Sequence, residues 1–407
     1  MTTFDLDQLT AAVTTHAAVR RRQRLQPVGG KGDKIFPPTY PGEERNNPLP
    51  RHVYERRRLN DTEVWCVLVD SVQSQANRLE ESLLQRLRDD SNTHIPHVIV
   101  DFAGSNLAGI KEITSLDAPH RVYDAILRDS LFDGEPFMRS SVGRSLAQAK
   151  PEDASAVLQV SPTALLFGSW HSTGEGGGLG AKFARCLVSE IVAVNVPMEN
   201  ETEREPRTAG RRTGSRIDPL GVLKKVEVFK GANGWDVNKE RAGKNAKQVR
   251  PSEINHGNIA PSIEALGVTC DYLEHTFVLS FAGLRRLRFG SDKRNGAGRA
   301  LLAALGLLAI AEQDVRGYSL RSRCELVCEA PAPLQVVHPD GSTSETALTL
   351  RNAIALYKDA FEAAKTAGFD FPDKPIRLKP QDKLIEIVRK SQELALSGEG
   401  GEGEEKQ

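Results

Sequence analysis

Hydrophobic and polar positions change period twice between residues 62 and 106. Residues 64–69 form a short apolar run with β-branched and aromatic side chains, typical of a strand buried on both faces. The following residues space their apolar side chains as in an amphipathic helix, and Asp70 and Ser71 offer N-cap chemistry before it. Residues 97–102 return to a strand pattern. We therefore predict a β-α-β unit.

The turn that opens this helix is rich in hydrogen-bonding side chains. It carries the amides of Gln73, Gln75 and Asn77 together with the guanidinium of Arg78. Such a helix start can hold a polar ligand. A solvated helix face with an N-cap accounts for the same residues, so the local sequence leaves both interpretations open.

The same periodicities predict further elements along the chain. We expect helices at 4–19, 115–131, 141–149, 280–287, 296–313, 348–367 and 381–396, and strands at 161–170, 185–196, 217–229, 267–279 and 318–327. The longest apolar run, residues 300–311, is too short to span a bilayer and predicts a buried helix. The last strand alternates, with Arg321 and Arg323 on one face, which favours an exposed platform.

Shifts in composition suggest four parts. We expect an N-terminal helix with a basic, glycine-rich loop over 1–60, and a core over 61–330 with mobile insertions near 197–216 and 230–262. Residues 331–396 are expected to form a C-terminal helical extension. The tail 397–407 is acidic, glycine-rich and without large apolar residues, so we expect it to be disordered.

Charge and cysteine content narrow the class of protein. The 54 basic and 54 acidic residues balance to a formal net charge of +0, which argues against nucleic-acid binding by bulk charge but leaves room for a local basic groove. Five cysteines, mostly in apolar runs, favour reduced thiols and a cytoplasmic protein. They lack the partner spacing of a zinc site. Polar residues follow Met1, so we expect no signal peptide.

Basic residues gather near the N-terminus. Arg20, Arg21, Arg22 and Arg24 follow the first predicted helix, where cations at a helix C-terminus would favour the macrodipole. Four arginines in five positions exceed that need and favour phosphate contact. The next loop adds Lys31 and Lys34 among glycines, together with aromatic residues that can stack on bases; an ordered surface loop is the alternative.

Two further loops have the composition of binding loops. The first, 174–182, is glycine-rich and leads to Lys182 and Arg185. It is not a P-loop, and it matches the dinucleotide motif only loosely, so contact with a sugar-phosphate backbone suits it better. The second, 251–262, offers Asn255, His256 and Asn258, which can bind bases or sugars or can form Asx turns.

Several phrases in order carry a family resemblance, among them LQPVGGKGDKIFPPTY, VLVDSVQSQANRLEESLL, SPTALLFGSWHSTG and PSEINHGNIAPSI. Over about residues 16–330 the chain resembles the backbone subunit of the type I-G (formerly I-U) CRISPR effector complex, a Csb-type RAMP protein of the Cas-seven family. The resemblance implies an α+β fold with an RRM-like (ferredoxin-like) core and large insertions, shaped like a hand. The C-terminal extension lies outside it.

The resemblance also implies a role in antiviral defence. Copies of such a subunit form a helical filament along a CRISPR RNA and present the guide for pairing with target DNA. The implied partners are the CRISPR RNA, the target DNA strand, further copies of the chain, a large subunit, a fused guide-capping and processing subunit and a recruited helicase-nuclease. No membrane, metal or cofactor is implied.

The resemblance implies no catalytic residue. A metal-dependent RNase of the same fold that cleaves target RNA is the alternative, with its aspartate among Asp33, Asp70, Asp101, Asp117 and Asp218, although no motif selects one. A nucleotide-dependent enzyme using the 174–182 loop is a third possibility. For RNA contact we select Arg20, Arg21, Arg22, Arg24, Lys31, Lys34, Gln73, Gln75, Asn77, Arg78, His120, Arg121, Lys182, Arg185, Asn255, His256, Asn258, Arg321 and Arg323.

Overall fold

The computed structural model describes residues 3–40, 52–59, 61–90, 92–171, 180–197 and 211–397, with side chains left undescribed at 211–216, 260–265 and 396–397. The acidic tail after 397, most of the insertion predicted at 197–216 and the first part of the glycine loop lie outside these residues. The fold is mixed α+β, as predicted.

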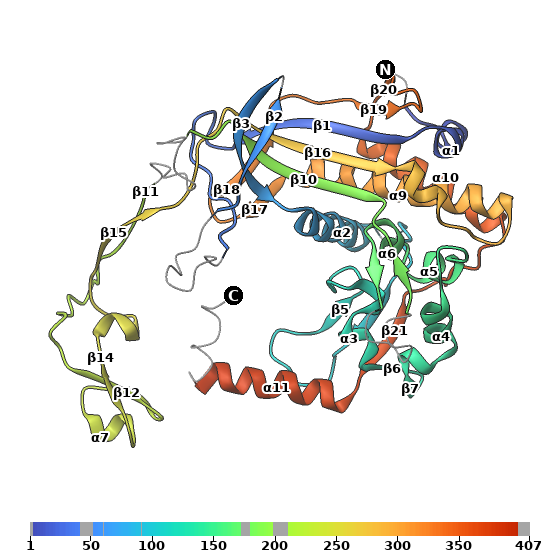
Figure 1. Cartoon of the computed structure of the whole chain (residues 1–407). Coiled ribbons are helices and arrows are strands. Elements are labelled where there is room, and N and C mark those ends of the chain that lie inside the picture. The colour runs from blue at the N-terminus through green and yellow to red at the C-terminus, as the bar shows by residue number, and fades with distance from the viewer. Residues whose placement is uncertain are drawn as a thin grey trace.

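A large antiparallel sheet of nine strands forms the upper layer (Figure 1). Its main path runs in the order β17 (Tyr318–Arg321), β18 (Cys324–Cys328), β1 (Ala18–Pro27), β16 (Tyr272–Ser280), β10 (Leu187–Val194), β3 (Thr62–Asp70) and β2 (Tyr54–Leu59). Two more strands, β19 (Leu334–Val337) and β20 (Thr343–Thr346), extend it where β19 pairs with β1. Buried and open positions alternate along β1 and β16, so each strand has one face in the core and one toward solvent.

Among the described residues, helices cover the inner face of this sheet. Figure 1 shows them beneath the strands: α2 (Val72–Asp89), α9 (Asp292–Arg316) and α10 (Leu350–Thr366), with α1 (Leu6–Thr15) at one end. The short helix α8 (Phe281–Arg285) packs against α1. The central helix, α9, is long and apolar enough by composition to cross a bilayer, but 83% of that window is buried inside the protein. The buried helix predicted from residues 300–311 is therefore confirmed as the core of the fold.

A second, smaller sheet lies below the helices. It runs in the order β5 (Glu112–Thr114), β4 (Val98–Asp101), β21 (Ile376–Pro380), β6 (Ser130–Phe132) and β7 (Glu135–Pro136). Short elements surround it: η1 (Arg121–Tyr123), α3 (Ala125–Arg128), η2 (Phe137–Arg139), α4 (Ser141–Gln148), α5 (Ser155–Val160), α6 (Pro162–Leu166) and the hairpin of β8 (Ser169–Trp170) and β9 (Lys182–Phe183). The long helix α11 (Asp382–Ser397) leaves this sheet at the bottom of Figure 1.

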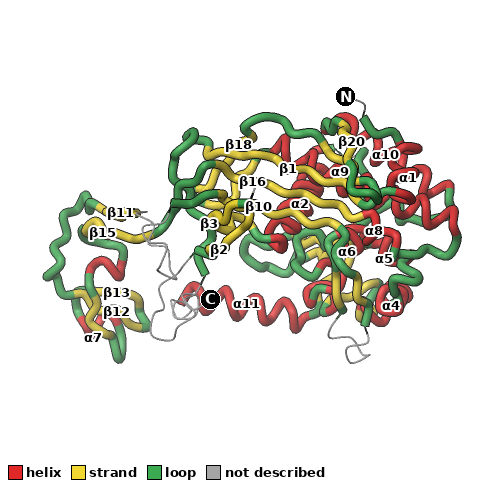
Figure 2. Tube along the Cα trace, turned by 45° about the horizontal axis from the view of Figure 1, so that its top comes forward, coloured by secondary structure: helices red, strands yellow, loops and turns green. Residues whose placement is uncertain are grey.

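An arm projects from the main body (Figure 2). Two strands form its stem, β11 (Arg211–Arg216) and β15 (Ile259–Ala265). Beyond them lie a three-stranded sheet of β12 (Val228–Gly231), β13 (Gly234–Asp236) and β14 (Lys247–Val249), the helix α7 (Lys239–Ala242) and the turn η3 (Pro251–Ile254). Segments that we predicted as polar insertions thus include a folded arm.

The two strands of the predicted β-α-β unit flank α2 but belong to different sheets. β3 pairs with β2 and β10 in the large sheet, whereas β4 pairs with β5 and β21 in the small one. The helical prediction for α2 is confirmed, and Ser71 caps it by accepting a hydrogen bond from the Ser74 amide. The prediction of one β-α-β unit is wrong because the strand partners come from distant parts of the chain.

Further local predictions are wrong. The first helix ends at Thr15, and the arginine cluster lies in β1 rather than at a helix end. Residues 115–131 form turns, η1 and α3 instead of one helix, with Arg121 at a φ of 56° that no α-helix accommodates. Pro162 starts the helix α6 within the predicted strand 161–170, and residues 217–227 contain no strand.

The strand predicted at 318–327 is a hairpin of β17 and β18. Arg323 lies at the turn with a φ of 59°, so Arg321 and Arg323 do not share one strand face. Helices at 141–149, 280–287, 296–313, 348–367 and 381–396 are confirmed with small shifts of their ends. Residues 331–396 also supply β19 to the large sheet and β21 to the small one, which connects this segment to both layers.

Candidate nucleic-acid interface

The open face of the large sheet carries a row of arginines from β1. Arg20, Arg22 and Arg24, which we call the outward stripe, occupy alternate positions and are exposed. Arg20 Nε donates to Gln335 Oε1 at 3.0 Å, and Arg22 Nη2 lies 2.7 Å from Glu274 Oε2. The guanidinium of Arg24 lies 4.3 Å from the centroid of the Tyr272 ring. The stripe thus combines exposed cations with an aromatic ring on one face.

Neighbouring strands add charge and a buried apolar cluster on this side of the sheet. Arg57 of β2 lies 2.5 Å from Glu190 of β10 and 2.5 Å from Glu55. A small apolar cluster centred on Val192 and Val194 packs beside them. Carboxylates therefore hold the guanidinium groups of Arg22 and Arg57 in place. The side chain of Arg22 nevertheless keeps 54% of its surface exposed.

The inward residues of the same strand belong to the core. Arg21 makes two hydrogen bonds to the carboxylate of Asp314, one of them 2.8 Å long, and its side chain is only 5% exposed. Asp314 also accepts a 2.6 Å hydrogen bond from the Tyr318 hydroxyl. This burial gives Arg21 a structural partner inside the chain and no surface on which RNA could bind, unlike the three outward arginines.

A chain of buried hydrogen bonds continues from Tyr318 beneath the sheet. The Tyr318 hydroxyl lies 3.2 Å from His275 Nδ1, and His275 Nε2 lies 2.6 Å from Ser189 Oγ. Ser189 Oγ in turn lies 3.0 Å from Gln75 Oε1. Complete burial holds the pKa of His275 well below its usual range, so the ring is neutral. Gln75, selected from the sequence for RNA contact, is part of this core network.

Asp70 anchors the start of α2. Its fully buried carboxylate accepts hydrogen bonds from Gln75 Nε2 at 2.6 Å, Arg78 Nε at 2.9 Å and Arg321 Nη2 at 3.1 Å, with a further bond from Ser74. The structure therefore brings the predicted residues Arg78 and Arg321 together. Because a buried charge must be paired, these two guanidinium groups are first of all the partners of Asp70.

The outer face of α2 is more open. Gln73 and Asn77 are exposed, and Arg78 borders two cavities of 150 Å³ and 320 Å³. Asn77 and Arg88 line the larger cavity, and Arg316 lines the smaller one. This face offers amides and guanidinium groups beside hollows, which suits a polar ligand.

Arg121 and Arg185 lie together at the junction between α2 and the small sheet. The guanidinium of Arg121 makes two 2.7 Å hydrogen bonds to the carboxylate of Glu80, and both side chains are buried. Burial raises the pKa of Glu80 to about 7. Arg185 Nε donates to the Phe167 carbonyl at 2.9 Å. Both arginines hold the backbone here, whereas the neighbouring His120 is exposed.

The remaining predicted residues are spread over three places. Lys31 is exposed and lies 3.3 Å from Glu329, Lys34 is half-buried, and Arg323 covers the Phe36 ring at 4.1 Å. Lys182 lies 5.1 Å from the exposed Trp170 ring in the β8–β9 hairpin. Asn255, His256 and Asn258 are on the arm, where the His256 and Trp235 ring centroids are 5.5 Å apart.

Sequence reasoning missed Arg57 and Tyr272 on the open face. For Tyr272 the alternation along β16 was the available signal, because the residue falls on its solvent-facing period. Arg57 is half-buried between the exposed Arg56 and Arg58 of β2, so alternation alone would not have selected it. It also missed the buried role of the aspartates: Asp70 is engaged as above, and the buried Asp218 carboxylate accepts from the Gly257 amide. The parts of the chain that the structure describes hold no group of three or more His, Cys, Asp or Glu arranged for a metal, and the five cysteines are free thiols.

Residues 19–198 match the model of a protein family described as CRISPR-associated protein GSU0053. No curated protein matches the sequence. The matched range begins within β1 and ends just after β10, so it includes the outward stripe, Asp70, α2 and the Glu80–Arg121 pair. The match agrees with the CRISPR-associated part of the family resemblance.

Proposed function

Starting from this match to a CRISPR-associated family, we propose that the chain is the CRISPR RNA-binding backbone subunit of a type I-G surveillance complex. In this role it oligomerises along the guide RNA and presents it for target DNA pairing in antiviral defence. The match over residues 19–198 is the observation that carries the proposal. The large sheet, the outward stripe and the arm support it.

The connections of the large sheet support an RRM-like core. Antiparallel β16 lies between β1 and β10, and β18 flanks β1 on the other side. The helix α2 precedes β10 and the helix α9 follows β16, with both helices on one face. A β-α-β-β-α-β core has this alternation, and the β2–β3 hairpin would then be an insertion that widens the sheet at the β10 edge.

The chemistry of the open face supports RNA contact. Guanidinium groups bind phosphates through paired N–H donors, and aromatic rings stack on bases without regard to sequence. Arg22, Arg24 and Tyr272 supply these groups side by side. The Glu274 carboxylate pairs with the Arg22 guanidinium, and a phosphate would replace part of that pairing.

The arm supports assembly from repeated copies. Large apolar side chains are exposed along it, including Ile217 at 85%, Leu220 at 74% and Leu223 at 72%. Trp235 and Val237 add exposed apolar surface nearby. An exposed apolar surface of this kind marks a protein interface, and a head-to-tail contact that does not close generates a filament. We assign the arm to the neighbouring copy in the filament.

In this proposal the subunit binds and does no chemistry. Base pairing by the guide reads the target DNA, and a separate recruited helicase-nuclease cuts it. The other effector subunits, the large one and the fused guide-capping and processing one, are partners of the filament in this proposal. Incubation of the guide complex with target RNA and a divalent metal tests this, since periodic cleavage would assign the chemistry to the chain itself.

Co-expression with CRISPR RNA tests the proposed function. The ratio of absorbance at 260 and 280 nm and the particle size should both rise with the guide present. RNase treatment should lower both again, to the values of the protein alone. The matched control is co-expression with an unrelated RNA of equal length. A nucleic-acid-free monomer in the presence of both the guide and the other effector subunits would contradict the proposal.

A further inference from the structure

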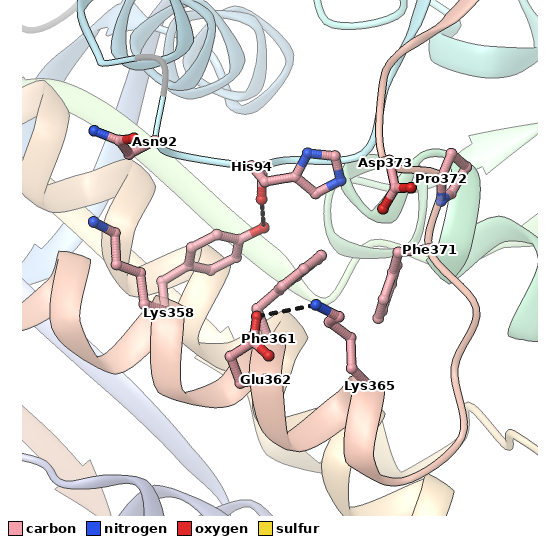
Figure 3. A pocket seen from close by; sticks show the side chains of 10 residues that line it. Asn92, His94, Lys358, Phe361, Glu362, Lys365, Phe371, Pro372 and Asp373 are labelled. Atoms are coloured by element: carbon pink, nitrogen blue, oxygen red, sulfur yellow. Dashed lines mark hydrogen bonds and ion pairs between the residues drawn. The ribbon is translucent and has the colours of Figure 1, made fainter.

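A cavity of 460 Å³ opens between α10, the segment 92–94 that follows α2, and the segment 371–373 that precedes β21 (Figure 3). Its volume lies within the range of small-molecule sites in proteins. The helices separate this cavity from the open sheet face, so it is distinct from the outward stripe. Most of its lining also lies beyond the residues that match the CRISPR-associated family.

The inner wall of this cavity is aromatic. Figure 3 shows the rings of His94, Phe361 and Phe371 turned toward the space between α10 and the 371–373 segment. The Phe361 centroid lies 5.2 Å from that of His94 and 4.6 Å from that of Phe371. The Tyr357 hydroxyl donates to the His94 carbonyl at 2.8 Å and fixes this segment against α10. Burial lowers the pKa of His94, so its ring presents an uncharged face.

The rim of the cavity is charged and polar. Lys358 and Lys365 rise from α10 on one side, and Asn92 and Asp373 come from the two loops. Lys365 Nζ lies 3.3 Å from Glu362 Oε1, which leaves donor capacity on the ammonium group. Within the described part of the chain, the side chains of Asn92 and Lys358 have no hydrogen-bond or ion-pair partner. Donor groups on the rim of an aromatic cavity, two of them with no partner among the described residues, point to a ligand.

We propose that this cavity binds a nucleotide, with its base against the rings of His94, Phe361 and Phe371 and its phosphate at Lys358 and Lys365. The aromatic wall fits a planar base, since base–aromatic stacking needs no particular sequence. The two ammonium groups, which α10 places two turns apart, offer a phosphate a cation at either end of the aromatic wall. Asn92 and Asp373 can bond to the edge of the base. The inference stands independently of the CRISPR RNA proposal, because it rests on a separate part of the structure.

The same chemistry has two sources, a free nucleotide or an unpaired nucleotide within a strand. Calorimetric titration of the full chain with each nucleoside monophosphate, inorganic phosphate and a single-stranded octanucleotide separates them. Saturable binding of a monophosphate that exceeds binding of phosphate alone supports a free nucleotide. Tighter binding of the octanucleotide that a monophosphate displaces supports a nucleotide in a strand.

Variants tie the binding to this cavity. The double change Lys358→Ala and Lys365→Ala affects exposed side chains and should lower nucleotide affinity about tenfold or more. Lys379→Ala, an exposed lysine on β21 outside the cavity, is the matched control and should leave affinity unchanged. Phe371→Leu should reduce the affinity for nucleotide and leave the affinity for inorganic phosphate unchanged.

Three results would overturn the proposal: no saturable binding of any monophosphate or octanucleotide, equal binding of inorganic phosphate and nucleotide, or equal affinity of the double lysine variant and the wild type. The lysine variants keep the test decisive if Phe371→Leu fails to fold. Failure here would leave guide RNA binding at the outward stripe untouched, so the two proposals fail separately.

Discussion

The two faces of β1 place the same residue type in opposite environments. Arg21 faces the helices, is 5% exposed and pairs with Asp314, whereas Arg22 faces solvent, is 54% exposed and pairs with Glu274. The inward guanidinium completes a buried hydrogen-bond network, and the outward one stays accessible to a ligand. Position on the strand therefore decides whether an arginine contributes to stability or to binding, although the residues are adjacent in sequence.

Removal of the inward arginine should have the largest effect on stability. Arg21→Ala leaves the Asp314 carboxylate without its guanidinium partner, and we expect the free energy of unfolding to fall by about 2–4 kcal/mol, because Asp314 is only partly buried. Urea unfolding measures this change. Arg22→Ala is the matched control and should cost less than about 1 kcal/mol. Equal losses in the two variants would break the comparison between the faces.

The second largest effect should be a loss of folding stability in acid, through the buried His275. His275 is neutral in the folded chain because its pKa is lowered, so the unfolded chain takes up a proton first as pH falls through 6.5. Its contribution is complete above that pH and is lost below it, by up to about 1.4 kcal/mol per pH unit. Unfolding of wild type and His275→Gln between pH 7.5 and about 5 measures the difference.

The expected result is a shallower loss of stability with acid for His275→Gln than for the wild type. His120→Gln makes the same chemical change at an exposed position and should keep the wild-type pH dependence. Parallel curves for wild type and His275→Gln would show that the buried network does not sense pH.

The smallest expected effect comes from removing the Tyr272 ring on the open face of the sheet. Tyr272→Leu removes the aromatic partner of Arg24 and one stacking surface, so guide RNA affinity should fall about two- to tenfold with little change in stability. Fluorescence anisotropy with a labelled guide measures this. Tyr272→Phe keeps the ring and should bind as the wild type does; an equal loss in both variants would assign the effect to the hydroxyl group instead.

Elements with a regular apolar period could be predicted from the sequence. The helices α9, α10 and α11 and the strand β10 follow that period, and Ser71 caps α2 as its position suggests. β1 could not be predicted, because Arg21 and Gln23 occupy inward positions and hide the alternation. Asp314, which follows 293 residues later on α9, makes an inward arginine tolerable there.

Parts of the candidate sites also depend on distant residues. Gln75 and Arg121 belong to sequences rich in hydrogen-bonding groups, yet their partners Ser189 and Glu80 draw both into the core. The aromatic cavity shows the reverse case, in which residues predicted as core line a cavity. Phe361 follows a helical apolar period and predicts core packing, and only the approach of the 92–94 segment turns that wall into a cavity.

The salt dependence of guide RNA binding tests the role of the outward stripe most directly. Equilibrium binding of the wild type and the Arg22→Ala, Arg24→Ala double variant is measured with several guide sequences over a range of salt concentrations. We predict that the double variant binds every guide about tenfold or more weakly and that its slope of log affinity against log salt is smaller by about 1–2. Unchanged affinity and slope would contradict the account, because the open face of the sheet would then carry no RNA.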